Sequence, residues 1–117
     1  MRDIITAIDL ILTWIEEAGG AEEAMLRNPL VRSGVERQIL VISEAANRLY
    51  GVDPLIAPKL APDIDWAGIR GIGNFIRHKY DDLDTAILVD VITNRLEPLR
   101  MAVERAMARI DVPKDDA

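Results

Sequence analysis

The sequence predicts an all-α protein, a four-helix up-and-down bundle with one additional short helix. Apolar residues recur every three or four positions over long stretches, and no stretch shows the period of two that marks a strand. Half of the 117 residues are apolar, but only two Trp, two Tyr and one Phe are present. Aliphatic side chains must therefore fill the core, and the length fits one domain.

The first long helix is predicted over residues 2–18. Its apolar residues follow the helical period, and Gly19-Gly20 ends it. A short helix is predicted over residues 21–27. The apolar stripe of the first helix consists of Ile4, Ile5, Ile8, Ile11, Leu12 and Ile15.

The second long helix has two possible starts. Asn28 can cap it with Pro29 in the first turn, or Ser33 and Glu36 can form a capping box slightly later. Gly51 is a typical residue just beyond a helix end. The predicted core face of this helix contains Val35, Ile39, Ile42, Ala46 and Leu49.

Residues 52–65 contain three prolines and are predicted to form a loop. A third helix is predicted over residues 66–80, with Asp65 as its cap. Gly71 and Gly73 weaken it by roughly 1 kcal/mol each relative to alanine.

The fourth helix is predicted over residues 85–110, with Asp84 or Thr85 as its cap. Pro98 lies inside it and removes a backbone hydrogen bond, so we expect a kink near residues 94–95. We predict one domain over residues 1–110 and a charged, flexible tail over residues 111–117. The core face is predicted to contain Leu88, Val91, Ile92, Leu96, Leu99, Val103, Met107 and Ile110.

Bulk composition excludes several classes of function. The net charge of −6 argues against a general nucleic-acid coat, but it is compatible with a small RNA-cleaving site or a basic partner protein. The absence of cysteine excludes disulfides and thiol catalysis. One histidine among scattered carboxylates is no metal-ligand set, so we predict neither metal nor cofactor. Acidic residues interrupt the apolar N-terminus, and no run approaches the ~20 apolar residues that cross a bilayer. We expect a cytoplasmic protein without membrane contact.

Most of the candidate catalytic residues lie in the stretch from Trp66 to Asp84. Arg70, Asn74 and His78 are four residues apart and would line one ridge of a helix. Arg77 would lie about 100° around that helix from His78. Tyr80 would lie at its end.

These residue types suit metal-free cleavage of RNA. Histidine moves protons near neutral pH, and a guanidinium holds a phosphate with forked, permanently charged donors. A ribose 2′-hydroxyl could attack its own phosphodiester and leave a 2′,3′-cyclic phosphate. This reaction needs a base and an acid, whereas each chain has only one histidine. A two-fold dimer would bring a second His78 to the same cleft. The alternative is structural, since His78 with Arg77 and Lys79 could interact with the dipole at a helix C-terminus.

The string W-x-x-I-R-G-I-G-N-F-I-R-H-K-Y-D-D-L-D resembles the signature region of the HEPN superfamily, specifically the HepT-like family. The likeness includes Arg37-Gln38 and Glu44-Ala45-Ala46 and covers nearly the whole chain. It implies an HEPN-like, all-helical homodimer and a metal-independent ribonuclease, in many cases the toxin of a type VII toxin–antitoxin pair. It implies His78 as the acid and base and Asn74 as the polar residue of the site. The implied antitoxin is an MNT nucleotidyltransferase, which can adenylylate the motif tyrosine, here Tyr80.

This sequence departs from the family pattern R-x4-6-H-x-Y at the arginine. The pattern places it at residues 71–73, which are Gly-Ile-Gly, whereas Arg70 comes one position early and Arg77 too late. The space left by Gly73 could accommodate the Arg70 guanidinium. The departure also leaves a second hypothesis open: a catalytically silent subunit whose groove docks the nucleotidyltransferase or a nucleotide.

Glu44 also has two interpretations. It could point into a dimer cleft and orient His78 or Arg77, as the family likeness suggests. It could instead be a solvated residue paired with Arg48 four positions later.

The tryptophans Trp14 and Trp66 are expected to serve packing. The arginines of the fourth helix are expected to form its solvated face; these are Arg95, Arg100, Arg105 and Arg109.

Overall fold

The computed structural model describes residues 2–52, 55, 58–59, 62, 66–71 and 85–111. These residues form helices and turns and contain no strand, so the all-α prediction is confirmed. Residues 66–71 are also helical. The remaining helices are α1 (Arg2–Glu17), α2 (Ala21–Arg27), α3 (Pro29–Val52), α6 (Thr85–Asp90), the π-helical turn η2 (Val91–Arg95) and α7 (Leu96–Asp111).

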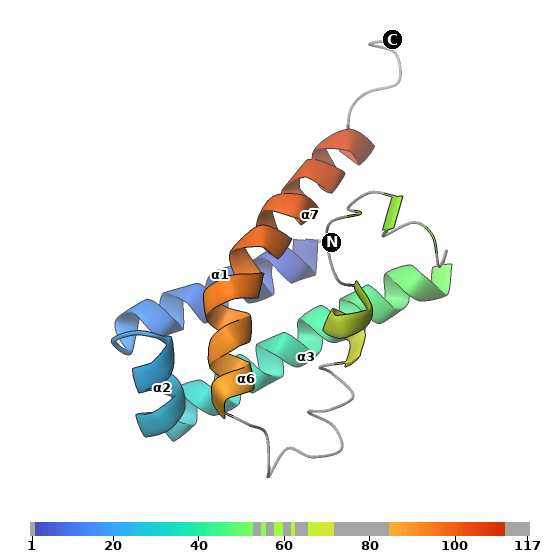
Figure 1. Cartoon of the computed structure of the whole chain (residues 1–117). Helices are drawn as coiled ribbons and strands as arrows, with labels where there is room; N and C mark the ends of the chain where they lie inside the picture. The colour runs from blue at the N-terminus through green and yellow to red at the C-terminus, as the bar shows by residue number, and fades with distance from the viewer. Residues whose placement is uncertain are drawn as a thin grey trace.

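Helices α1 and α3 run antiparallel, while α6, η2 and α7 follow one another as a single rod that crosses them (Figure 1). The most extensive contacts join α1 to α3, and α1 also packs on α7. The short helix α2 contacts both α3 and α6. No helix in the described ranges combines the length and the apolar character needed to cross a membrane.

The turn between α1 and α2 needs its two glycines. Gly19 and Gly20 have φ angles of +92° and +117°, in the region that side chains with a Cβ rarely adopt. The Gly20 N–H donates to the Ile15 carbonyl at 2.9 Å and closes the end of α1. The predicted stop at Gly19-Gly20 is therefore confirmed.

The core lies where the predicted apolar faces meet. The inward positions of α1 are buried, while Ile5 and Leu12 at the edge of its stripe are partly buried. The predicted core face of α6, η2 and α7 is buried from Leu88 to Val103. Met107 is partly buried against the core. The fully buried large side chains include Ile4, Ile8, Ile11, Met25, Leu88, Val35 and Val103.

The two possible starts of α3 are resolved in favour of Asn28. Its Oδ1 atom accepts a hydrogen bond from the Val31 N–H at 3.1 Å, which satisfies a donor that the helix itself cannot pair. Ser33 lies inside the helix. The predicted end at Gly51 is wrong, because α3 continues through Gly51 to Val52.

Replacing Asn28 with alanine is expected to lower the free energy of unfolding by about 1 kcal/mol, because the Val31 N–H loses its partner. Ser33→Ala is the matched control and is expected to be neutral, since Ser33 is exposed within the helix. Urea denaturation followed by circular dichroism measures both. Equal losses in the two variants would contradict the assignment of the cap.

The rod is distorted where Pro98 was expected to disturb it. A proline lacks the N–H that would bond the carbonyl four residues earlier, and its ring crowds that carbonyl. The backbone adopts π-helical hydrogen bonding over Val91–Arg95, which includes the predicted position. The Asp90 carboxylate accepts from Asn94 Nδ2 at 2.8 Å and from Arg95 Nε at 3.1 Å across this wider turn.

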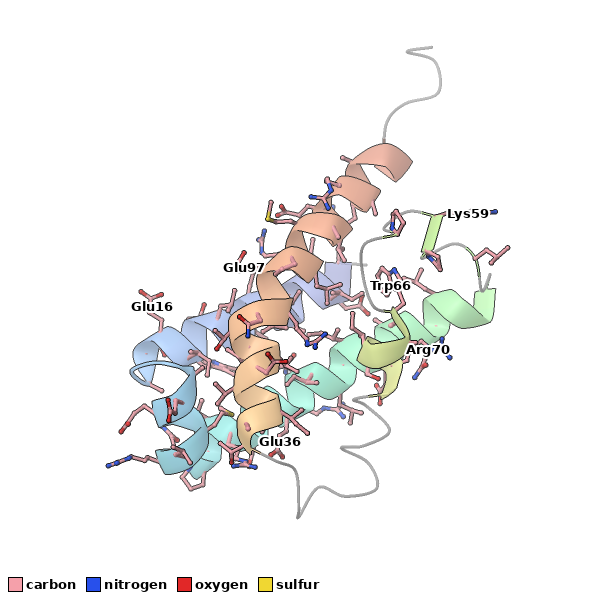
Figure 2. The ribbon with its side chains drawn as sticks, in the orientation of Figure 1. Glu16, Glu36, Lys59, Trp66, Arg70 and Glu97 are labelled. Carbon is pink, nitrogen blue, oxygen red and sulfur yellow. The ribbon has the colours of Figure 1, made fainter. Side chains whose placement is uncertain are left out.

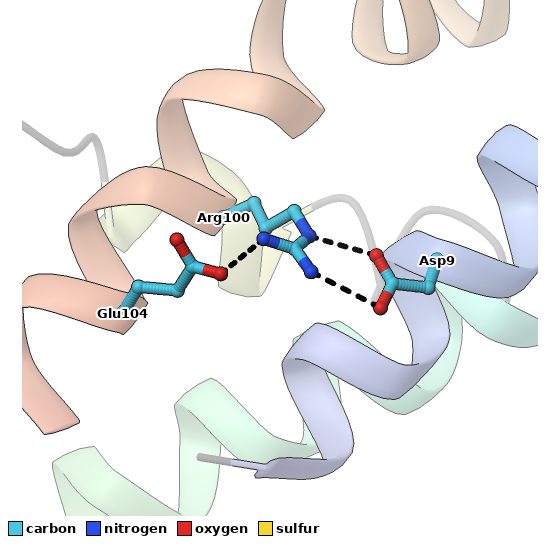
Figure 3. A network of polar contacts seen from close by, with 3 residues as sticks. All are labelled: Asp9, Arg100 and Glu104. Atoms are coloured by element: carbon cyan, nitrogen blue, oxygen red, sulfur yellow. Dashed lines mark hydrogen bonds and ion pairs between the residues drawn. The ribbon is translucent and has the colours of Figure 1, made fainter.

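Arg100 is not a purely solvated residue, which corrects the expectation for this arginine. It lies on α7 and reaches across to α1, where its Nε and Nη2 atoms bind the two oxygens of Asp9 at 2.7 and 3.2 Å (Figure 3). Its Nη1 atom donates to Glu104. The Arg100 side chain is 28% exposed and the Asp9 side chain 50% exposed. This bidentate pair links α1 to α7 where the two helices pack together.

The Asp9–Arg100 pair is expected to stabilise the fold in a pH-dependent way. The hydrogen bond from Arg100 holds the pKa of Asp9 below its usual value, against the opposing effect of partial burial. A depressed carboxylate pKa contributes stability above the unfolded-state pKa, about 3.9, and this contribution is lost as the pH falls through the folded-state pKa.

A double-mutant cycle with Asp9→Asn and Arg100→Gln measures this coupling. We expect a positive coupling at pH 7 that shrinks with added salt and disappears below the folded-state pKa of Asp9. The matched control is the pair Glu23–Arg27, whose atoms are 3.5 Å apart and whose side chains are 55% and 76% exposed. Equal coupling in both pairs would contradict the prediction.

Candidate functional site

The motif-bearing stretch, from Trp66 to Asp84, begins with a helical turn whose side chains pack into the core. Residues 66–71 are helical, as predicted, and Trp66 is only 8% exposed. Ile69 packs against the same core. The packing role predicted for Trp66 is therefore confirmed, and Trp14 likewise packs on the core beside Gly34. The predicted cap Asp65 lies outside the described residues.

Arg70 is bound to α3 through both its backbone and its side chain. The Ser43 hydroxyl donates to the Arg70 carbonyl oxygen at 3.0 Å, and Arg70 Nε donates to Asn47 Oδ1 at 3.1 Å. Figure 2 shows Arg70 on the short helical turn beside α3. Ser43 is fully buried, and Ser43 and Asn47 share a face of α3 because they are four residues apart. The hydrogen bond to Asn47 therefore orients the Arg70 guanidinium before any substrate binds.

The other predicted motif residues lie outside the described residues, namely Asn74, Arg77, His78 and Tyr80, as does Gly73. Their assignments stay predictions. Of the predicted site, the structure places Arg70 and Glu44, both on or beside α3.

Glu44 is half-buried on α3, next to the buried Ser43. Its predicted surface partner, Arg48, forms an ion pair with Asp3 of α1, in which Nη2 and Oδ2 are 2.6 Å apart. Arg48 therefore does not depend on Glu44 for a partner. The intermediate exposure of Glu44 is compatible with a position at the edge of a site.

A second contact with α3 lies directly after the end of the motif-bearing stretch, at Thr85. Arg32 of α3 donates from Nη1 to Thr85 Oγ1 at 2.7 Å and to the Met25 carbonyl at 3.2 Å. Its Nε atom donates to Glu36 Oε1 at 3.1 Å. Arg32 thus joins α2, α3 and the first residue of α6.

Sequence reasoning missed Arg32, Ser43 and Asn47. A signal for Arg32 was present, because this residue precedes Val35 by three positions and extends the apolar stripe of α3. A charged residue on a buried stripe indicates a partner on another element. The identity of that partner, Thr85, depends on packing between helices.

A small cavity lies in the described part of the core, next to Ile69. The cavity between α3, Ile69, η2 and α7 has a volume of about 30 Å³, roughly one water, and its walls are almost entirely apolar. Within the described ranges, no three His, Cys, Asp or Glu side chains gather in a way that could hold a metal ion.

The chain matches the model of a protein family described as "Ribonuclease HepT-like" over residues 4–106. The matched region runs from α1 into α7 and includes the motif-bearing stretch together with the α3 residues that bind its start. No solved structure matches this chain.

Proposed function

The chain belongs to the HepT-like ribonuclease family, and we propose that it is a toxin that cleaves RNA without a metal ion. The observation that carries this proposal is the family match, which spans the His78-Lys79-Tyr80 element and the helix that holds Arg70. The protein would act in the cytoplasm as a homodimer, with residues 1–110 as its working domain.

The proposed reaction is an internal transesterification. A base removes the proton from a ribose 2′-hydroxyl, whose oxygen attacks the adjacent phosphorus. The bond from phosphorus to the 5′-oxygen breaks, and an acid protonates that oxygen. The products are a 2′,3′-cyclic phosphate and a 5′-hydroxyl. His78 would serve as acid or base, and its copy in the second subunit would supply the other proton-transfer group.

An arginine would stabilise the negative charge on the phosphorane. Arg70 supports this role because Asn47 orients its guanidinium in advance. Arg77 is the second candidate, and Asn74 would position the phosphate. Glu44 would stand at the edge of the site as a supporting residue.

We expect the two arginines to respond differently to alanine substitution. Arg70→Ala should lower cleavage and also the free energy of unfolding, by about 1–3 kcal/mol, because its bond to Asn47 is lost. Arg77→Ala should show which arginine faces the phosphate, with a loss of 10²–10³-fold in kcat if it is Arg77. Single-turnover cleavage and urea denaturation of both variants provide the measurement. Unchanged stability of Arg70→Ala would contradict the assigned role of Asn47.

Exposed apolar side chains support the proposed dimer. Leu26, Leu30 and Ile87 are 60%, 83% and 40% exposed, and they lie on α2, the start of α3 and α6. These elements are neighbours, because α2 contacts both α3 and α6, and a two-fold dimer would cover the three side chains with the same surface of a second copy. Sedimentation velocity over a hundredfold range of concentration tests the dimer, and a monomer at every concentration would contradict it.

The proposed antitoxin is an MNT-type nucleotidyltransferase encoded beside this chain. It would silence the ribonuclease by adenylylating Tyr80. Mass spectrometry after co-expression should show an adenylyl adduct that persists in Tyr50→Phe and is lost in Tyr80→Phe. An unmodified Tyr80 in the co-expressed protein would contradict this mode of control.

The ribonuclease activity itself is tested with purified protein and single-stranded RNA in EDTA. We expect fragments with 2′,3′-cyclic phosphate ends, produced by wild type and by Tyr50→Phe but not by His78→Ala. The activity should co-elute with the protein in size-exclusion chromatography, which separates it from a contaminating nuclease.

A second function, a silent subunit that docks the nucleotidyltransferase or a nucleotide, is favoured by one observation. The family arginine is displaced, since residues 71–73 are Gly-Ile-Gly and Arg70 binds Asn47. Absence of cleavage at high protein concentration, together with stable binding of the neighbouring gene product, would support this function and contradict the first.

A further inference from the structure

Both ends of the motif-bearing stretch are attached to the same helix. Near its start, the Ser43 hydroxyl and the Asn47 amide of α3 bind the backbone and side chain of Arg70. After it, Arg32 of α3 binds the hydroxyl of Thr85, the first residue of α6. The chain between Gly71 and Thr85 therefore starts and finishes on α3.

The three α3 residues lie on one face of that helix. At 100° per residue, Arg32, Ser43 and Asn47 fall within an arc of about 60°, and Arg32 and Ser43 are about 16 Å apart along the axis. A single helix with a continuous hydrogen-bond ladder thus sets the distance and direction between the two attachments.

Burial or additional hydrogen bonds support each of the two attachments. Ser43 is fully buried, so its hydroxyl has no competing water and its bond to Arg70 is maintained. Arg32 is 26% exposed, and its bonds to Glu36 and to the Met25 carbonyl hold the guanidinium against Thr85. Neither attachment uses a residue of the family motif other than Arg70.

We infer that Arg32, Ser43 and Asn47 are positioning residues, which act on the reaction by holding both ends of the His78-bearing stretch on α3. The inference rests on the proposed ribonuclease function. These residues do not touch the substrate in this scheme. They hold the two described residues, Arg70 and Thr85, between which the chain carries His78. In catalysis, a misplacement of a reacting group by about 1 Å can cost 10²-fold in rate.

The two attachments can be removed one at a time. Ser43→Ala deletes the donor to the Arg70 carbonyl, and Thr85→Val deletes the acceptor for Arg32 at nearly constant volume. Thr85→Ser keeps the hydroxyl and serves as the rescue variant. Ser33→Ala and Thr13→Val make the same chemical changes at exposed helical positions. Ile11→Val, at a fully buried site on α1, controls for a general loss of stability.

The first readout is RNA cleavage, with kcat and KM determined at a temperature where every variant is folded. We expect Ser43→Ala and Thr85→Val to lower kcat by about 10–100-fold with KM changed less than about threefold. Thr85→Ser and the three controls should keep the wild-type kcat. A kcat of Ser43→Ala and Thr85→Val equal to that of Ile11→Val would overturn the inference.

The second readout does not need activity. His78 is the only histidine in the chain, so its imidazole gives one set of resonances in the NMR spectrum. Ser43→Ala and Thr85→Val should shift these resonances, and Ser33→Ala and Thr13→Val should not. If wild type fails to cleave RNA, the proposed function falls, and the imidazole resonances alone decide the positioning role. Unchanged resonances in both attachment variants would overturn it.

Discussion

Replacing His78 with alanine is expected to lower the rate constant for RNA cleavage by about 10²–10⁴-fold, the usual contribution of a general acid or base. No other histidine in the chain can take over the proton transfer, and no cysteine is present. The loss should appear in single-turnover experiments, which report the chemical step apart from product release.

The matched control for this loss uses the same substitution chemistry at a basic residue outside the motif. Lys59→Ala removes an exposed side chain that belongs neither to the motif nor to the family likeness, and it should keep activity within a few-fold of wild type. Mixed dimers of wild type and His78→Ala add a second test. If both imidazoles serve one site, the mixed dimer should be as inactive as the homodimeric variant. Half the wild-type activity would show that each subunit works alone and would contradict the shared site.

The boundaries of most helices could be predicted because their signals are local. The 3.6-residue period of α1 is uninterrupted, and Gly19 and Gly20 adopt the positive φ angles that end it. Asn28 lies directly before the first turn of α3 and caps it. The end of α3 was missed because a single glycine costs only about 1 kcal/mol in a helix. Gly51 alone therefore does not end the helix, which continues to Val52.

The partners within the candidate site could not be predicted from the sequence. The Ser43–Arg70, Asn47–Arg70 and Arg32–Thr85 bonds join residues 27, 23 and 53 positions apart. A hydrophobic period identifies which face of a helix is buried. It does not determine how far one helix slides or rotates against its neighbour, and these two quantities decide which polar groups meet. The same reason explains Arg100, whose partner Asp9 lies on α1.

Because these contacts depend on helix packing, we expect substitutions in the α1–α3–α7 core to destabilise the fold strongly. Ile8 is fully buried on α1, the helix that packs on both α3 and α7. Ile8→Ala is expected to lower the free energy of unfolding by about 2–5 kcal/mol, because it removes buried carbon atoms and leaves a cavity. That loss is a large part of the 5–15 kcal/mol typical of a domain.

Leu10→Ala removes the same number of carbon atoms from the same helix and is the matched control for Ile8→Ala. Leu10 is 38% exposed, so its loss should cost well under half as much. Ile8→Val, which removes one carbon atom, should cost less than Ile8→Ala, about 0.5–1.5 kcal/mol. Urea denaturation at one fixed protein concentration measures all three, since a dimer gains apparent stability with concentration. Equal losses for Ile8→Ala and Leu10→Ala would mean that α1 does not bury its Ile8 face against the other helices. The packing of α1 on α3, the helix that binds the motif-bearing stretch, would then be wrong as well.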